Sequence, residues 1–173
     1  MSFRSHTCIL IALNMRVLAI DPGYDRLGVA VMELHHGREV VLDSACIETD
    51  RAATLPERLS VLGREIAALI KTHKPTALAI ETLYFNKNHK TAIAVAQARG
   101  VAIFLAQQAG CVVYEFGPQA IKVAVTGYGK SDKAAVSRMV RTLTPSVREG
   151  ARDDEYDAIA VGITCLAHHG RSV

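Results

Sequence analysis

Two apolar runs on either side of a tight turn limit what this chain can fold into. Residues 17–20 (VLAI) and 27–32 (LGVAVM) flank residues 21–26, whose Asp-Pro-Gly start is typical of a turn. Apolar runs of this length with turn residues between them predict a hairpin of two buried strands. Asp21 would then stand at the exposed end of the first strand, where a carboxylate either stabilises the turn or binds a cation. The turn alone does not separate these two roles.

The rest of the chain alternates between apolar strands and helices. Residues 40–47 predict a third antiparallel strand, residues 76–81 a buried strand that ends in a carboxylate, and residues 112–116 a last strand. A capping box at Thr54 predicts a helix that runs to about His73. Further helices are expected over 91–109, from 117 to about 126, through Leu143 after a cap at Ser131, and from Asp153 to about His168. This order predicts an α/β fold with a mixed sheet.

Length and composition favour a single domain. The chain has 173 residues, of which 50% are hydrophobic, enough for one substantial core. We expect this domain over residues 15–173, and residues 1–14 as an extension upstream of the natural start, because Met15 directly precedes the first strand. The four scattered cysteines are typical of free thiols in a reducing compartment, so a cytoplasmic location is expected. No apolar run is long enough to predict a membrane span.

The charge of the chain is unevenly distributed. Its formal net charge is only +3, but residues 117–148 hold six basic side chains against one acid, Asp132. Residues 32–68 hold seven acids and four basic side chains. Such polarisation suggests that one face meets a phosphate backbone, although any single lysine could simply lie on a solvated helix face.

Four acids stand where buried elements begin or end. Asp21 and Glu81 follow predicted strands, while Asp154 and Asp157 open the last helix three residues apart, so they share a face. Acids in a first helical turn are also favoured by the helix dipole alone. A carboxylate beside the apolar residues that follow Asp157 is costly, however, unless it is paired or bound to a metal. Oxygen ligands without thiolate or imidazole suit Mg²⁺ or Mn²⁺, and two such ions can cleave a phosphodiester. The residue types therefore favour a metal-dependent nuclease.

At this point the chain resembles the RuvC family of bacterial Holliday-junction resolvases, within the ribonuclease H-like superfamily. The matching segments follow one another from residue 15 onward: AIDPG at 19–23, GVAV at 28–31, AIE at 79–81, QARGVA at 97–102, IKVAVTGYG at 121–129, MVRTLT at 139–144 and D-x-x-D-A-I-A at 154–160. The resemblance implies a ribonuclease H-like fold, with a five-stranded mixed sheet of three antiparallel strands and then two parallel ones, flanked by helices.

The resemblance also implies a function and a site. Asp21, Glu81, Asp154 and Asp157 would be the catalytic, metal-binding acids for two Mg²⁺ ions, which Mn²⁺ can replace. Asp153, beside Asp154, leaves the register of the third acid open. Either Tyr84 or Phe85 would stack on a junction base, whereas a loop residue anchored in the core is the alternative. Lys122 and Lys133 would hold the backbone near the scissile bond, and Lys133 would also steady charge that develops on that phosphate.

The implied activity is resolution of four-way DNA junctions in recombination and repair. Each nick would leave a 5′-phosphate and a 3′-hydroxyl end. Because the two nicks are symmetric, they require a homodimer with two active sites. The apolar helix over 91–109 is the candidate interface. The branch-migration proteins RuvA and RuvB are implied as partners.

Three other readings compete with this one. The Asp-Pro-Gly hairpin also occurs in actin-like and sugar-kinase ATPases, but one hairpin in 173 residues cannot supply their two domains. A related nuclease family acts on ribosomal RNA precursors, and the long basic region over 117–143 argues against it. A junction-binding module without catalysis would not need acids at all four positions.

Overall fold

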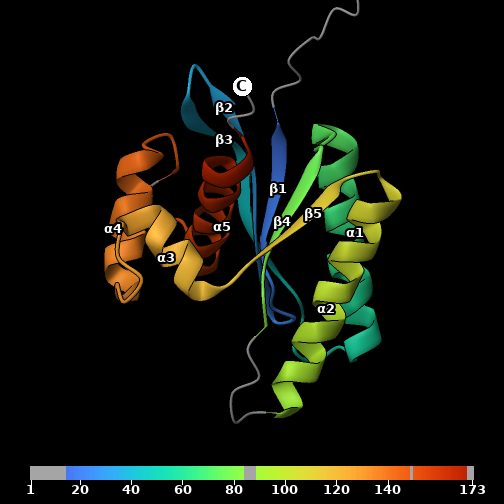
Figure 1. The fold of residues 1–173 in the computed structure, drawn as a ribbon. Helices are drawn as coiled ribbons and strands as arrows, with labels where there is room; N and C mark the ends of the chain where they lie inside the picture. Colours follow the sequence, from blue (N-terminus) through green and yellow to red (C-terminus); the bar gives the residue numbers. More distant parts are fainter. Residues whose placement is uncertain (1–14, 84–88, 149, 171–173) are drawn as a thin grey trace, which may run out of the picture.

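The computed structural model describes residues 15–83, 89–148 and 150–170, except for the side chains of residues 89 and 90. In this part of the chain a five-stranded sheet lies between two layers of helices (Figure 1). The strands are β1 (Arg16–Asp21), β2 (Arg26–His35), β3 (Arg38–Glu48), β4 (Ala77–Glu81) and β5 (Val112–Phe116). The helices are α1 (Leu55–His73), α2 (His89–Gln108), α3 (Pro118–Thr126), α4 (Lys133–Leu143) and α5 (Asp153–His169).

The sheet is mixed, in the order β3-β2-β1-β4-β5. β2 pairs antiparallel with both β1 and β3, whereas β1 with β4 and β4 with β5 are parallel pairs. The predicted fold class, with three antiparallel strands followed by two parallel ones, is confirmed. Ile20 pairs with Ile80 at the end of the β1–β4 ladder, so Asp21 and Glu81 lie side by side where these two neighbouring strands end.

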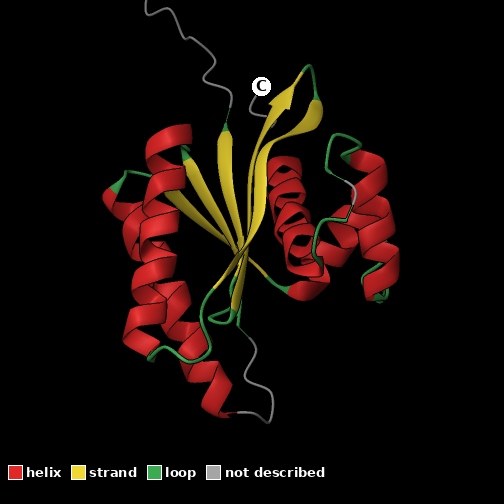
Figure 2. Ribbon diagram, turned by 180° about the vertical axis from the view of Figure 1, so that it is seen from behind, coloured by secondary structure: helices red, strands yellow, loops and turns green. Residues whose placement is uncertain are grey.

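Each face of the sheet buries its own helical layer. Val17 and Ala19 of β1 pack with α3, α4 and α5, whereas Leu18 and Ile20 pack with α1 and α2. Figure 2 shows the two layers from behind, with the sheet edge-on between them. Because β1 and β4 are covered on both faces, they are continuous apolar runs, which is typical of central strands in such a sheet.

Helix α5 approaches the sheet closely because two glycines remove side chains at the contact. A Cβ at Gly28 of β2 would lie 1.9 Å from the carbonyl oxygen of Asp154, and a Cβ at Gly162 of α5 would lie 2.4 Å from Met32 Sδ. Real Cβ atoms essentially never come this close to another heavy atom. The first turn of α5 therefore lies directly against β2.

Two of the predicted helix starts differ from the structure: α2 begins at His89, where residue 91 was predicted, and the cap of α4 is not Ser131. The capping box at Thr54 is confirmed, since Glu57 accepts a hydrogen bond from the Thr54 N–H at 2.8 Å. The predicted cap at Ser131 is wrong: Asp132 caps α4 by accepting the Ala135 N–H at 2.7 Å. Ser and Asp cap helices about equally well, so two such neighbours are distinguished only by tertiary contacts, and Ser131 instead bonds the Thr126 hydroxyl at 2.7 Å.

Two expectations about cysteines and membranes can be compared with the described residues. Cys46, Cys111 and Cys165 are free thiols, as predicted. None of the helices in the described ranges is long and apolar enough to cross a membrane. The proposed extension over residues 1–14 lies outside the described residues, and its assignment stays a prediction.

Candidate active site

The four predicted acids come together from three separate elements. Asp21 ends β1, Glu81 ends the neighbouring strand β4, and Asp154 and Asp157 lie in the first two turns of α5. The close approach of α5 to β2 brings its first turns to the edge of the sheet where both strands end. The carboxylate of Asp21 consequently experiences the charges of the other three.

Burial and like charge make three of these carboxylates reluctant to ionise. Burial, followed by repulsion from Asp157, Glu81 and Asp154, raises the pKa of Asp21 to about 7. The pKa of Glu81 is also raised, by burial and then by Asp157, against the opposing charge of Lys122. Burial likewise raises the pKa of Asp157, although Lys133 opposes the shift. Acids with pKa values perturbed in this way cluster at functional sites.

Two lysines flank the acids on the side of α3 and α4. Lys133 Nζ lies 2.9 Å from Asp157 Oδ2, and burial of the ammonium is outweighed by Asp157, so the pKa of Lys133 is raised. Lys122 and Lys133 line a hollow of about 210 Å³ together with Glu81 and Asp157. The structure thus brings both predicted lysines to the predicted acids. A larger hollow, of about 790 Å³, lies between α1 and α2, and no acid lines it.

Side-chain exposure distinguishes the two candidates for the third acid. The Asp153 side chain is 76% exposed and lies 3.6 Å from Lys133 Nζ. The Asp154 side chain is only 20% exposed and is contacted by Arg26, with 3.4 Å between Nε and Oδ2. Asp154 is therefore the better placed of the two to join Asp21 and Asp157.

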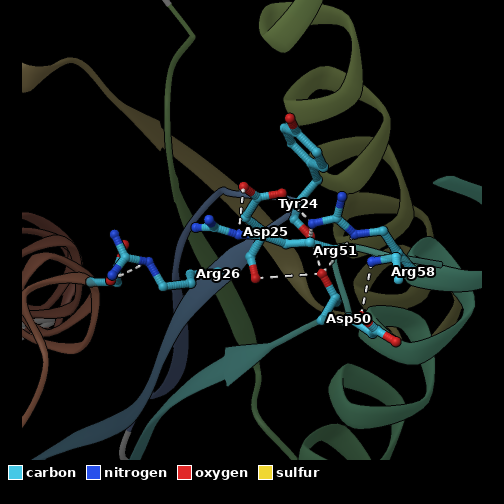
Figure 3. Close-up of polar contacts among 9 residues, drawn as sticks. Tyr24, Asp25, Arg26, Asp50, Arg51 and Arg58 are labelled. Carbon is cyan, nitrogen blue, oxygen red and sulfur yellow. Dashed lines mark hydrogen bonds and ion pairs between the residues drawn. The ribbon is translucent and has the colours of Figure 1, made fainter. Parts of the chain in front are cut away.

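The turn between β1 and β2 is anchored on the α1 side by a buried arginine (Figure 3). Arg58 pairs with the carboxylate of Asp25, donates to the Tyr24 carbonyl at 3.2 Å and to Thr49 Oγ1 at 2.9 Å, and stacks over the Tyr24 ring. Gly23 is required in this turn, because a Cβ there would lie 2.0 Å from the Arg26 carbonyl oxygen. The backbone that follows Asp21 is consequently held in one conformation.

The donor set fits Mg²⁺ or Mn²⁺ in its chemistry. All four candidate ligands are carboxylates, and hard divalent cations prefer such oxygens. Burial and mutual repulsion raise the pKa values of Asp21, Glu81 and Asp157, and a divalent cation bound among them would favour their charged forms. Within the described residues no three His, Cys, Asp or Glu side chains converge closely enough to form a ready-made metal cluster. The arrangement therefore gathers the ligands without closing them around an ion.

Some residues of the site fall outside the sequence predictions or outside the described structure. Tyr84 and Phe85 lie outside the described residues, so their stacking role stays a prediction. Arg26 and Arg58 were missed. Arg26 could have been suspected because it lies in the turn that follows Asp21, whereas nothing near Arg58 in the sequence connects it with that turn.

Comparison with known proteins agrees with this geometry. The family model described as "Crossover junction endodeoxyribonuclease RuvC" matches residues 17–165. The chain is 44% identical over 154 residues to crossover junction endodeoxyribonuclease RuvC of Desulfitobacterium hafniense, covering 89% of this chain and 93% of that protein. The RuvC of Thermosipho melanesiensis is 41% identical over 153 residues, covering 88% and 97%.

Solved structures show the same fold. The structure described as T. thermophilus RuvC in complex with Holliday junction substrate matches with a TM-score of 0.82 at 28% identity, covering 89% of this chain and 94% of that one. The yeast mitochondrial Holliday junction resolvase Ydc2, at 12% identity and a TM-score of 0.64, shares the fold alone. Because the family model and relatives above 40% identity cover most of the sequence, the chain belongs to the RuvC family of crossover junction endodeoxyribonucleases, which are nucleases.

Proposed function

We propose that this protein is a structure-specific endonuclease that resolves four-way (Holliday) DNA junctions in homologous recombination and DNA repair. The observation that carries the proposal is the gathering of acids from β1, β4 and α5: Glu81 and Asp157 share one hollow with Lys122 and Lys133, and the carboxylate of Asp21 feels the charges of Glu81, Asp154 and Asp157. A relative of the same fold is described in complex with a Holliday junction substrate, which supports this choice of DNA.

In this proposal Asp21, Glu81, Asp154 and Asp157 hold two Mg²⁺ ions, with Mn²⁺ able to replace them. Such ions, when bound, activate a water for attack on phosphorus and stabilise the leaving oxygen. When the leaving oxygen is the 3′ oxygen of the cleaved strand, hydrolysis leaves a 5′-phosphate and a 3′-hydroxyl. The protein contributes a fixed turn after Asp21, a fixed spacing between β2 and α5, and the Lys133 ammonium beside the reacting phosphate.

The backbone of the cleaved strand would lie over Lys122 and Lys133 and continue along α4. Arg138 and Arg141 of α4 are exposed on the same side, and a second hollow links Lys133 to both of them. Cations spaced along a groove bind successive phosphates without regard to sequence. Tyr84 or Phe85 would add a stacking contact with an unpaired base.

A second copy of the chain would complete the enzyme. A four-way junction has approximate two-fold symmetry, so paired nicks require two active sites related by a two-fold axis. Helix α2 exposes Ile93 by 61% and Phe104 by 60%, and Phe104 lines the hollow of about 790 Å³ between α1 and α2. Large apolar side chains exposed on one helix, one of them beside an apolar hollow, suit an interface with a second copy. Partnership with RuvA and RuvB, and a cytoplasmic location, stay predictions from the family resemblance.

The test is cleavage of a synthetic four-way junction in Mg²⁺ or Mn²⁺, with the cut sites mapped on each strand and linear duplex of the same sequence as the comparison. We expect paired, symmetric nicks in the junction, and loss of cleavage with retained binding in Asp21→Asn. Glu65→Gln, an exposed acid on α1, is the control and should cleave normally. Unchanged nicking by Asp21→Asn would show that the carboxylate mechanism is wrong.

A further inference from the structure

Arg26 lies beside the acids but on the opposite side from the lysines. Asp157 faces α4, where Lys133 pairs with it. Asp154 faces β2 and β3, where its neighbours are Arg26, Gly28 and Cys46, the last with Sγ 3.8 Å from Oδ2. The carboxylates therefore stand between cations on two sides, and only the lysine side has a role in the proposed function.

The contact between Arg26 and Asp154 is loose. Nε and Oδ2 are 3.4 Å apart, and the Arg26 side chain is 48% exposed. Among the described residues no other hydrogen bond or ion pair of the Arg26 side chain is found. Arg16, in comparison, holds Glu33 through Nε at 3.0 Å and Nη2 at 2.8 Å, as a fixed pair does.

Figure 3 shows that Arg26 extends away from the anchored part of the turn, whereas Tyr24 and Asp25 are engaged with Arg58. The backbone at Arg26 is thus fixed while its side chain is tethered by a single partner. A guanidinium in this state exchanges its partner readily when that partner loses its charge, and its fork matches a phosphate as well as a carboxylate.

We propose that Arg26 is a DNA-backbone contact that Asp154 holds in reserve: when Asp154 is neutralised, the Arg26 guanidinium turns to a phosphate on the β2–β3 side of the site. This inference rests on the proposed function, because it takes nucleic acid as the ligand and cation binding as the natural neutralising event. The affinity for the DNA backbone on that side would then increase only after the charge of Asp154 is neutralised. Neutralisation of the acids would in this way be coupled to DNA binding.

A double-mutant cycle in EDTA tests this without metal or catalysis. Binding of a labelled four-way junction is measured by fluorescence anisotropy over a range of salt concentrations for the wild type, Asp154→Asn, Arg26→Gln and the double variant. We expect Asp154→Asn to steepen the slope of log K against log salt by about 1, as one additional phosphate contact does, and to leave the slope unchanged in the Arg26→Gln background.

Arg38→Gln is the matched control, since Arg38 is an exposed arginine at the opposite end of β2 and β3. Asp154→Asn should steepen the slope in that background as it does in the wild type, and Asp154→Ala should reproduce the effect with a different neutral side chain. Equal steepening with and without Arg26 would overturn the inference. The cycle can also be read on linear duplex, so failure to prefer a junction would count against the proposed function alone.

Discussion

Asp21→Asn should make the metal-free protein more stable, although it removes an active-site residue. The pKa of Asp21 in the folded protein is about 7, against an ordinary value of 3.8, mainly because the carboxyl is buried. The folded state therefore binds the proton more tightly than the unfolded state does. The free energy of unfolding consequently decreases as the pH rises from about 4 to about 7.

The size of the effect follows from this difference in pKa. It corresponds to at most about 4 kcal/mol of unfavourable free energy above pH 7, since each pKa unit is worth about 1.4 kcal/mol. Neighbouring acids can take up a proton instead of Asp21, so we expect a gain of about 2 to 4 kcal/mol for Asp21→Asn at pH 8. At pH 4, where the carboxyl is protonated in the folded protein, the gain should largely disappear.

Urea denaturation in EDTA at pH 4 and pH 8 measures this gain. Glu65→Gln, the exposed control on α1, should show little change at either pH. In Mg²⁺ at pH 8 the wild type should recover stability and Asp21→Asn should recover less, because the cation supplies the charge that the acids lack. If Asp21→Asn is no more stable than the wild type at pH 8 in EDTA, the account of Asp21 as a carboxylate destabilised by burial and repulsion is incorrect.

Four further substitutions test other parts of the structure. Arg138→Ala and Arg141→Ala should each lower the salt dependence of junction binding by about one phosphate contact without abolishing cleavage at low salt. A salt titration measures this against Arg38→Ala, an exposed arginine at the far end of β2 and β3. Phe104→Asp should convert a dimer into monomers in sedimentation and should lose paired cutting; a stable dimer in this variant would move the interface elsewhere. Arg58→Met should lower the free energy of unfolding by about 2 kcal/mol in urea, because it removes the buried partner of the Asp25 carboxylate and a donor to the Thr49 hydroxyl; an unchanged midpoint would mean that the turn does not depend on this anchor.

The sequence was sufficient for the fold class and for the positions of Asp21 and Glu81, because both depend on local patterns. A strand that ends in a carboxylate is visible in sequence, and two parallel strands bring such ends together. The match of Asp21 and Glu81 to neighbouring strands confirms this reasoning about position. Their roles in metal binding and catalysis are still proposals.

What the sequence could not show depends on the packing of distant segments. Asp153 and Asp154 differ by one helical step, about 100°, which is enough to expose one and half-bury the other, but only the docking of α5 fixes the phase. The pairs of Arg26 with Asp154 and of Arg58 with Asp25 join residues far apart in the chain.

Helix α2 illustrates the same limit. Its alanines at 94, 98, 102 and 106 are buried, while the larger Phe104 is exposed. Larger apolar side chains are usually the buried ones, so this helix reverses the expectation. A nearly all-apolar sequence predicts that the helix is packed, but small side chains decide which face lies against the sheet, because they permit the closer approach.

Gly28 has a consequence for how such a nuclease can be redesigned. A glycine has no functional group, so a search for residues to alter ion preference would pass over it and change the acids themselves. The Asp154 carbonyl occupies the place that a side chain at residue 28 would need, so even alanine there must displace the start of α5. Asp154 and Asp157 would move together relative to Asp21 and Glu81. Under the proposed function, the spacing of the four acids would therefore be adjustable from β2, at a position outside the proposed ligands, and graded changes in helix-to-sheet spacing would be a route to selecting between small and large cations while all four carboxylates are kept.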